Sequence, residues 1–217
     1  MAANLGPKIV RTGLILELDA ADINSYSGAD ATWTDLSGNI NNFTLAGSPA
    51  FNSANGGSIV FDGANDSATR SLVSSTVTAT MDIWFKINAY SQSTLFVNGD
   101  SSANGYGFAF GAGGASTSTL YVFFGGINNN VVSFAGLAIN TWYNAIYTRT
   151  TNSNILYIRG ISRSTDVISN PTIPTTITSV GSSAFNGNIA IARIYNRVLS
   201  ATEVLQNYNV VKSRFGL

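Results

Sequence analysis

The chain has 217 residues, no cysteine, no histidine and a formal net charge of zero, from 11 basic and 11 acidic side chains. These numbers exclude a disulfide framework, thiol chemistry and histidine-based catalysis or metal binding, and they leave no basic footprint for nucleic acid. Charged residues make up 10% of the sequence, against about 25% in an average soluble domain. A chain of this length and composition is typical of one all-β domain with a neutral, hydrogen-bonding surface.

Short apolar segments follow one another along the chain, separated by turn-forming residues. Trp33 anchors one of the turns, 32–39, in which Asp, Ser, Gly and Asn supply the turn chemistry. Strands at such regular short spacing are typical of an all-β sandwich. The segments that we predict as strands are 14–19, 58–63, 78–87, 94–97, 106–110, 120–124, 131–134, 142–149, 155–161 and 177–181.

The C-terminal part predicts a last strand followed by one short helix. Apolar residues at both odd and even positions of 185–195 indicate a strand buried on both faces. Ser200 followed by Glu203 is a capping box, and Leu199 with Val204 is a hydrophobic staple, so a helix begins after Ser200. Its apolar stripe is expected at Val204, Leu205, Tyr208 and Val211.

Several sequence blocks, taken together, resemble a known family. They span nearly the whole chain in one order, at 13–21, 33–39, 59–66, 84–86, 142–148, 156–160 and 187–203. In this order they resemble the laminin-G-like branch of the concanavalin-A-like lectin/glucanase superfamily, in the version that is common in bacteriophage virion structural proteins. The resemblance implies an all-β jelly-roll sandwich of two curved antiparallel sheets, here with one short C-terminal helix. We expect residues 14–217 to form a single laminin-G-like domain.

Two further expectations concern packing. Residues 1–13 are expected to form an N-terminal arm that docks onto a neighbouring subunit. The family often has an acidic residue where this chain has Ile191, which we expect to face the same way as Ile189 and Arg193. The apolar replacement predicts that this face is covered by another sheet or another subunit.

A glycoside hydrolase is the enzymatic alternative that the superfamily offers, because its hydrolases use clustered carboxylates. This chain has only two glutamates, and the capping box accounts for Glu203. Glu17 and Asp19 lie on one face of a strand, roughly 7 Å apart, which suits an inverting pair. The glucanase-type signature is missing, however, and Asp19 at a strand end also suits a loop cap. We therefore predict a protein without enzymatic activity.

Calcium is the cofactor that the resemblance makes possible, because superfamily members hold it with Asp, Asn and backbone oxygens. The oxygen-rich turn that contains Asp62, Asn65 and Asp66 is the candidate site. Asp-Gly and Asn-Gly sequences also form turns with no metal. Two other turns stay open as alternatives, with Asp35 and Asn39, and with Asn98 and Asp100.

Glycans are the candidate ligands, since sugar sites combine an aromatic platform with amide and hydroxyl donors. Tyr90, Tyr106 and the loop 125–130 supply such groups, and the loop amides are Asn128, Asn129 and Asn130. For any single aromatic residue of a sandwich, packing in the core is the competing explanation. The motif positions of the three tryptophans indicate core anchors.

The function that we predict is that of a non-enzymatic virion structural protein. It would be made in the host cytoplasm and exposed on the virion surface, as a capsid decoration or fibre module that aids attachment to host or surface glycans. Its partners would be other virion proteins, and copies of itself in a homo-oligomer. No signal peptide or transmembrane run is visible, so we predict no membrane partner. The alternative is a free carbohydrate-binding lectin or adhesin located extracellularly.

Overall fold

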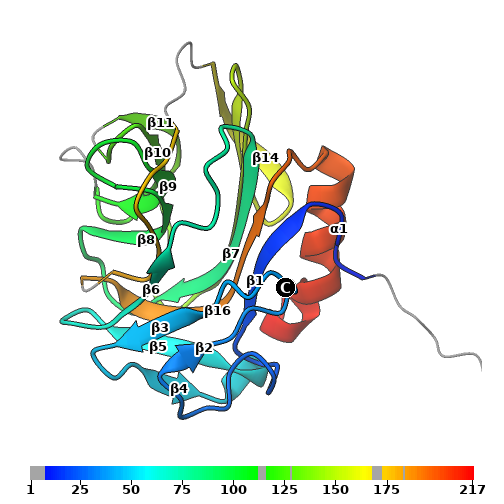
Figure 1. The fold of residues 1–217 in the computed structure, drawn as a ribbon. Helices are drawn as coiled ribbons and strands as arrows, with labels where there is room; N and C mark the ends of the chain where they lie inside the picture. The colour runs from blue at the N-terminus through cyan, green and yellow to red at the C-terminus, as the bar shows by residue number, and fades with distance from the viewer. Residues whose placement is uncertain (1–7, 112–115, 128, 168–172, 183) are drawn as a thin grey trace, which may run out of the picture.

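The computed structural model describes residues 8–111, 116–127, 129–167, 173–182 and 184–217. Two antiparallel sheets face one another, and one C-terminal helix lies against the outer face of one of them (Figure 1). This architecture confirms the predicted all-β sandwich. Within the described residues, no helix is long and apolar enough to cross a membrane.

The first sheet has the strand order β14-β13-β12-β7-β16-β5-β4, and β1 also pairs with β16. The bounds of its strands are β1 Leu14–Asp19, β4 Ala50–Asn52, β5 Ser58–Asp62, β7 Ala79–Ile87, β12 Trp142–Arg149, β13 Asn154–Ile158, β14 Ile161–Asp166 and β16 Asn186–Tyr195.

The second sheet has the strand order β11-β10-β9-β8-β15-β6-β3-β2. The bounds of its strands are β2 Thr32–Trp33, β3 Phe43–Ala46, β6 Ser67–Ser71, β8 Ser93–Asn98, β9 Tyr106–Phe110, β10 Leu120–Phe124, β11 Asn130–Phe134 and β15 Ile177–Val180. The helical elements are α1 Ala201–Val211 and the 3₁₀ turns η1 Ala54–Gly56 and η3 Lys212–Phe215.

Strand β16 lies at the centre of the first sheet. It pairs with β7 along one edge, and with β5 and then β1 along the other. All its residues after the first are buried, as predicted for a strand covered on both faces. The pairing with β7 shifts register between Ile189 and Ile191. Ile189 therefore packs between the sheets, whereas Ile191 packs on the outer face, which Arg193 shares. The predicted orientation of Ile191 is thus right relative to Arg193 and wrong relative to Ile189.

The outer face around Ile191 is covered by the end of the same chain. Trp84 on β7 stacks with Tyr208 of α1 at 5.7 Å between ring centroids, and with Phe215 of η3 at 4.6 Å. The ring of Trp142 also contacts Phe215, with 4.5 Å between the ring centroids. The apolar face thus exists as predicted, but it is covered by α1 and η3 rather than by another sheet or another subunit.

Helix α1 begins as the sequence predicts. The Ser200 side chain accepts a hydrogen bond from the backbone of Glu203, and the Glu203 side chain accepts one from the backbone of Ser200. The buried stripe differs at one position, because Leu205 is 44% exposed whereas Asn207 is fully buried. Asn207 accepts a hydrogen bond from the Val10 backbone and donates one to the Tyr195 hydroxyl.

Residues 8–13 of the predicted arm pack on their own domain. The Tyr195 hydroxyl donates to the carbonyl of Val10, and Gln206 of α1 donates to the carbonyl of Lys8. Val10 belongs to the apolar cluster under the start of α1. This part of the arm is therefore bound to its own helix, and docking onto a neighbouring subunit stays a prediction. Residues 1–7 lie outside the described residues.

The strands missed in the sequence are short or polar. Strands β2, β3, β4 and β6 were not predicted, and the predicted strand 155–161 ends at Ile158, where β13 gives way to a turn at Arg159 and Gly160 before β14 begins. Both turn residues have positive φ, of 54° and 74°, so the chain reverses and β14 pairs back onto β13. Strand β14 is mostly exposed, which explains why its sequence carries no apolar signal.

Glu203 should make the stability of the fold depend on pH in the acid range. Its hydrogen bonds with Arg197 and with the Ser200 backbone lower the pKa of its carboxyl from 4.5 to about 2. The unfolded chain takes up this proton near pH 4.5, so the contribution is complete above about pH 5 and lost as the pH falls toward 2. We expect Glu203→Gln to show a flatter decline of urea-unfolding free energy over this window than the parent protein. Parallel declines would contradict this assignment.

Candidate functional site

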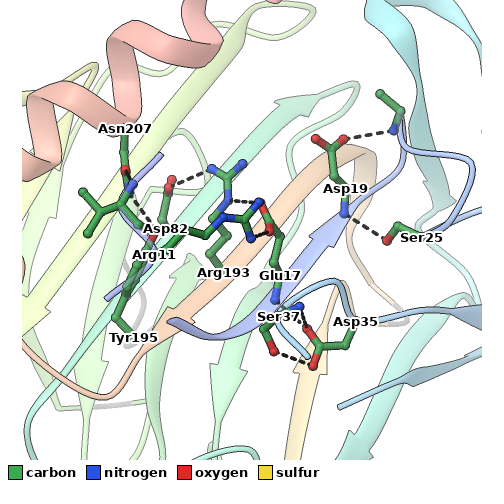
Figure 2. Close-up of polar contacts among 12 residues, drawn as sticks. Arg11, Glu17, Asp19, Ser25, Asp35, Ser37, Asp82, Arg193, Tyr195 and Asn207 are labelled. Atoms are coloured by element: carbon green, nitrogen blue, oxygen red, sulfur yellow. Dashed lines mark hydrogen bonds and ion pairs between the residues drawn. The ribbon is translucent and has the colours of Figure 1, made fainter. Parts of the chain in front are cut away.

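The catalytic pair that the sequence suggested, Glu17 and Asp19, is tied into the chain's own contacts (Figure 2). Glu17 is 4% exposed and accepts from Arg193 at 3.1 Å and from Arg11. Arg193 also reaches Asp82 of the neighbouring strand β7, at 3.2 Å. The three strands β1, β16 and β7 are thereby joined by one buried ion network on the helix side of the sheet.

The two arginines of this network, Arg11 and Arg193, balance the charges of its two carboxylates, Glu17 and Asp82. Burial by itself lowers the pKa of Arg193, but the carboxylates of Asp82 and Glu17 outweigh that effect and hold the pKa above its ordinary range. Asn144 donates a further hydrogen bond to Asp82, at 2.7 Å. The two carboxyl oxygens of Glu17 are thus each bonded to a guanidinium group of the same chain.

Asp19 and Asp35 serve as anchors for loops. Asp19 accepts from Arg214 at 2.7 Å and from the backbone of Ala21 at 3.0 Å, which matches the loop-cap alternative. Asp35 accepts from the backbones of Glu17 and Ser37, and from that of Asn41, and also from the Ser37 hydroxyl. Both carboxylates therefore have a structural explanation within the turns around β1.

A hollow of about 350 Å³ lies between this network and α1. Its walls carry both signs of charge, from Lys8 and Arg11 and from Asp19 and Asp22. Asp22 already accepts from the backbone and the side chain of Asn24. The hollow is thus a mixed-charge surface beside a paired network.

The predicted calcium turn is held by hydrogen bonds of its own. Asp62 accepts from the backbones of Ala64 and Asn65, and the Asp62 backbone donates to Asp66 at 3.0 Å. Asp66 is 3% exposed, and burial raises the pKa of its carboxyl. Over the part of the chain that the structure describes, no three acidic side chains gather as metal ligands. Calcium binding stays a prediction.

The residues predicted to bind glycans do not lie together in the structure. Tyr90 is 45% exposed, and its hydroxyl donates to the carbonyl of Leu137. Tyr106 is fully buried, so its selection as a surface platform is wrong: its ring lies between the sheets. Asn129 is exposed and donates to the carbonyl of Phe124. Asn130 is the first residue of β11, and Asn128 lies outside the described residues.

Strand register shows that Tyr90 and Asn129 lie at opposite ends of the second sheet. Tyr90 precedes β8, whose first residue pairs with the last residue of β9. Asn129 follows β10, whose last residue pairs with the first residue of β9. The length of these strands therefore separates the two side chains, and they do not form one sugar site.

A different surface pocket combines an aromatic wall with polar groups. It has a volume of about 330 Å³ and lies where the loop 26–31 meets the segment 45–51. Tyr26 and Phe51 contact each other with ring centroids 5.7 Å apart, and Phe51 is 36% exposed. Asp30 lines the same pocket and accepts from the Ser27 hydroxyl at 2.5 Å.

The electrostatics of this pocket are set by Asp30. Burial raises the pKa of the Tyr26 hydroxyl, and the nearby Asp30 carboxylate raises it further. Asp30 is itself exposed, so its oxygens are accessible to a bound hydroxyl. The sequence analysis missed this pocket. The available signal was Phe51, a large apolar residue in a stretch of small polar residues close to Pro49.

The comparisons with known proteins concern the fold. Domain 4 of AbnA, a GH43 extracellular arabinanase from Geobacillus stearothermophilus determined with arabinotriose, has a TM-score of 0.69 at 16% identity, over 90% of this chain and 98% of that one. The botulinum neurotoxin serotype D ligand binding domain, in complex with N-acetylneuraminic acid, has a TM-score of 0.70 at 14% identity, over 93% and 52%. The Trypanosoma rangeli sialidase in complex with sialic acid has a TM-score of 0.67 at 13% identity, over 90% and 32%.

This chain thus spans nearly all of the arabinanase domain, about half of the toxin domain and about a third of the sialidase. Comparison with curated proteins found no match. The family Laminin_G_3, described as the concanavalin A-like lectin/glucanases superfamily, matches residues 55–205. That range covers more than half of the sequence, and it holds the central strand β16 and the start of α1. The chain therefore belongs to the Laminin_G_3 family of the concanavalin A-like lectin/glucanases superfamily.

Proposed function

We propose that this protein is a non-enzymatic, lectin-like module that binds glycans and is displayed on the surface of a bacteriophage particle, as a capsid decoration or a fibre component. The observation that carries the proposal is the commitment of both glutamates to the fold. Glu17 is bound by two arginines, and Glu203 by Arg197 and the helix cap. Because both glutamates are engaged in this way, we infer that the protein binds glycans rather than hydrolyses them.

The pocket formed by Tyr26, Asp30 and Phe51 is the glycan site that we propose. An exposed phenyl ring offers an apolar platform for the C–H face of a sugar, and a carboxylate accepts hydrogen bonds from sugar hydroxyls. Pockets that combine apolar walls with a few placed polar groups are the usual form of small-ligand sites. Solved structures of the same fold that contain arabinotriose or sialic acid support the ligand class.

Display in many copies would make up for a shallow site. Linking weak sites on one particle raises the overall avidity without any new contact. The neutral, Ser/Thr/Asn-rich composition and the likeness of the sequence blocks to phage structural proteins support the virion location. Mass spectrometry of purified particles tests this part: the protein should be present at a fixed copy number. Recovery only from the medium, with glycan binding intact, would favour the free lectin.

Phe51→Ala should weaken glycan binding by about tenfold, because truncating an aromatic platform loses roughly 1 to 1.5 kcal/mol. Binding to a glycan array, with the protein multimerised on a tag, identifies the sugar, and titration calorimetry then gives the affinity. Tyr90→Ala is the matched control, since Tyr90 is an exposed aromatic residue outside the pocket. Loss of binding in Tyr90→Ala but not in Phe51→Ala would refute the pocket and restore Tyr90 as the candidate.

A further inference from the structure

Arg149 is a buried guanidinium with aromatic rings around it. It is the last residue of β12 and is 1% exposed. Its guanidinium carbon lies 4.1 Å from the ring centroid of Tyr106 and 4.3 Å from that of Phe124, both on the opposite sheet. Tyr106 begins β9 and Phe124 ends β10, so the group lies between the two sheets, where these strands begin or end.

None of the three guanidinium nitrogens has a hydrogen-bond partner among the described residues. The ion pairs that these residues form do not include Arg149. Asn154 lies directly opposite Arg149 in the β12–β13 pairing and is 1% exposed. Its side-chain oxygen accepts from the Tyr147 hydroxyl, which leaves its Nδ2 group as a second donor with no partner in the part of the chain that the structure describes.

The Tyr106 hydroxyl lies at the same end of the sandwich and interacts with the side chains of Asn98 and Ser74. The Asn98 amide is already bonded to the Ser74 backbone and the Thr178 hydroxyl. The groups on Arg149 and Asn154 are thus donors, and Arg149 faces aromatic rings rather than acceptors. Burial lowers the pKa of Arg149, as expected for a cation without a counter-charge.

Arg193 shows how the same chain treats a buried arginine elsewhere. It is equally buried and is paired with Glu17 and Asp82. Fully buried arginines are almost always paired, and the aromatic faces around Arg149 interact with the charge but leave its in-plane N–H groups unsatisfied. A negatively charged hydrogen-bond acceptor at the edge of the guanidinium plane would bond the N–H groups of Arg149 and also balance its positive charge.

We propose that a chloride ion binds between the sheets at Arg149. It would accept hydrogen bonds from the guanidinium and from Asn154 Nδ2. A monatomic ion is the smallest anion that could accept these hydrogen bonds at a group as buried as Arg149. The site is a structural counter-ion site that closes one end of the sandwich, and it does not rest on the proposed glycan binding.

The test is the chloride dependence of urea unfolding at constant ionic strength, with methanesulfonate as the replacing anion. An ion that binds only the folded state raises the folding constant by up to about tenfold for each tenfold rise in its concentration above Kd. The parent protein should show this slope, and Arg149→Met should lose it. The comparison between the two proteins removes the general effect of the salts. Equal slopes in both would overturn the proposal.

Asn154→Asp provides a second test that does not remove the arginine. The new carboxylate would lie opposite Arg149 and replace the ion, while its oxygen still accepts from Tyr147. This variant should fold, be at least as stable as the parent at low chloride, and show no chloride dependence. A chloride slope equal to that of the parent would overturn the proposal. A crystal soaked in bromide should show an anomalous peak beside Arg149, and a peak only elsewhere would also refute it.

Discussion

Replacing Arg193 by methionine should destabilise the protein by about 3 to 5 kcal/mol, measured as the change in urea-unfolding free energy. The reason is the pair of carboxylates that remains. Glu17 and Asp82 are buried, and Arg193 bonds both. Removing one partner of a buried ion pair leaves the desolvation cost of the other without compensation. Arg11 still reaches Glu17, but Asp82 would keep only its hydrogen bond from Asn144.

Arg197→Met is the matched control for this variant. Arg197 also pairs with a glutamate, Glu203, but at side-chain exposures of 30% and 29%, and a pair of this kind contributes at most about 1 kcal/mol. Combining Arg193→Met with Glu17→Met and Asp82→Leu should recover part of the loss, since well-packed apolar groups often replace a buried ion network at little cost. A loss below about 1 kcal/mol in Arg193→Met alone would mean that water reaches the network.

Phe215→Ala should cost about 3 kcal/mol, because the ring fills the outer-face cluster between two tryptophans. Its centroid lies 4.6 Å from that of Trp84 and 4.5 Å from that of Trp142. Truncation leaves a cavity that the backbone of η3 and the sheet cannot readily close. Urea unfolding measures the loss, and tryptophan fluorescence reports the new environment of the two indole rings.

Leu205→Ala is the control for this second variant. Leu205 lies on α1, which leads into η3, but is 44% exposed, so its truncation should change the free energy of unfolding by about 0.5 kcal/mol or less. An equal effect of the two substitutions would contradict the covering role that the structure gives to Phe215. An unchanged fluorescence spectrum in Phe215→Ala would contradict it as well.

The sequence by itself determined the features that depend on near neighbours. The capping box at Ser200 and Glu203, the last strand and the strand at 78–87 were all predicted, because caps, turns and apolar patterns act over a few residues. The ordered blocks also predicted the family. The short strands β4 and β6 were missed, since their pairing comes from the sheet around them rather than from an apolar pattern of their own.

Tertiary structure decided which face of each element is buried and against what. A register shift in β16 sends Ile191 outward to the chain's own helix, and the opposite sheet covers Tyr106. The pocket joins Tyr26 to Phe51, and the ion network joins Glu17 to Asp82 and Arg193, across separations that no local pattern spans. Which long-range partners meet depends on strand order and register, because a shift of one residue turns every side chain to the other face of the sheet.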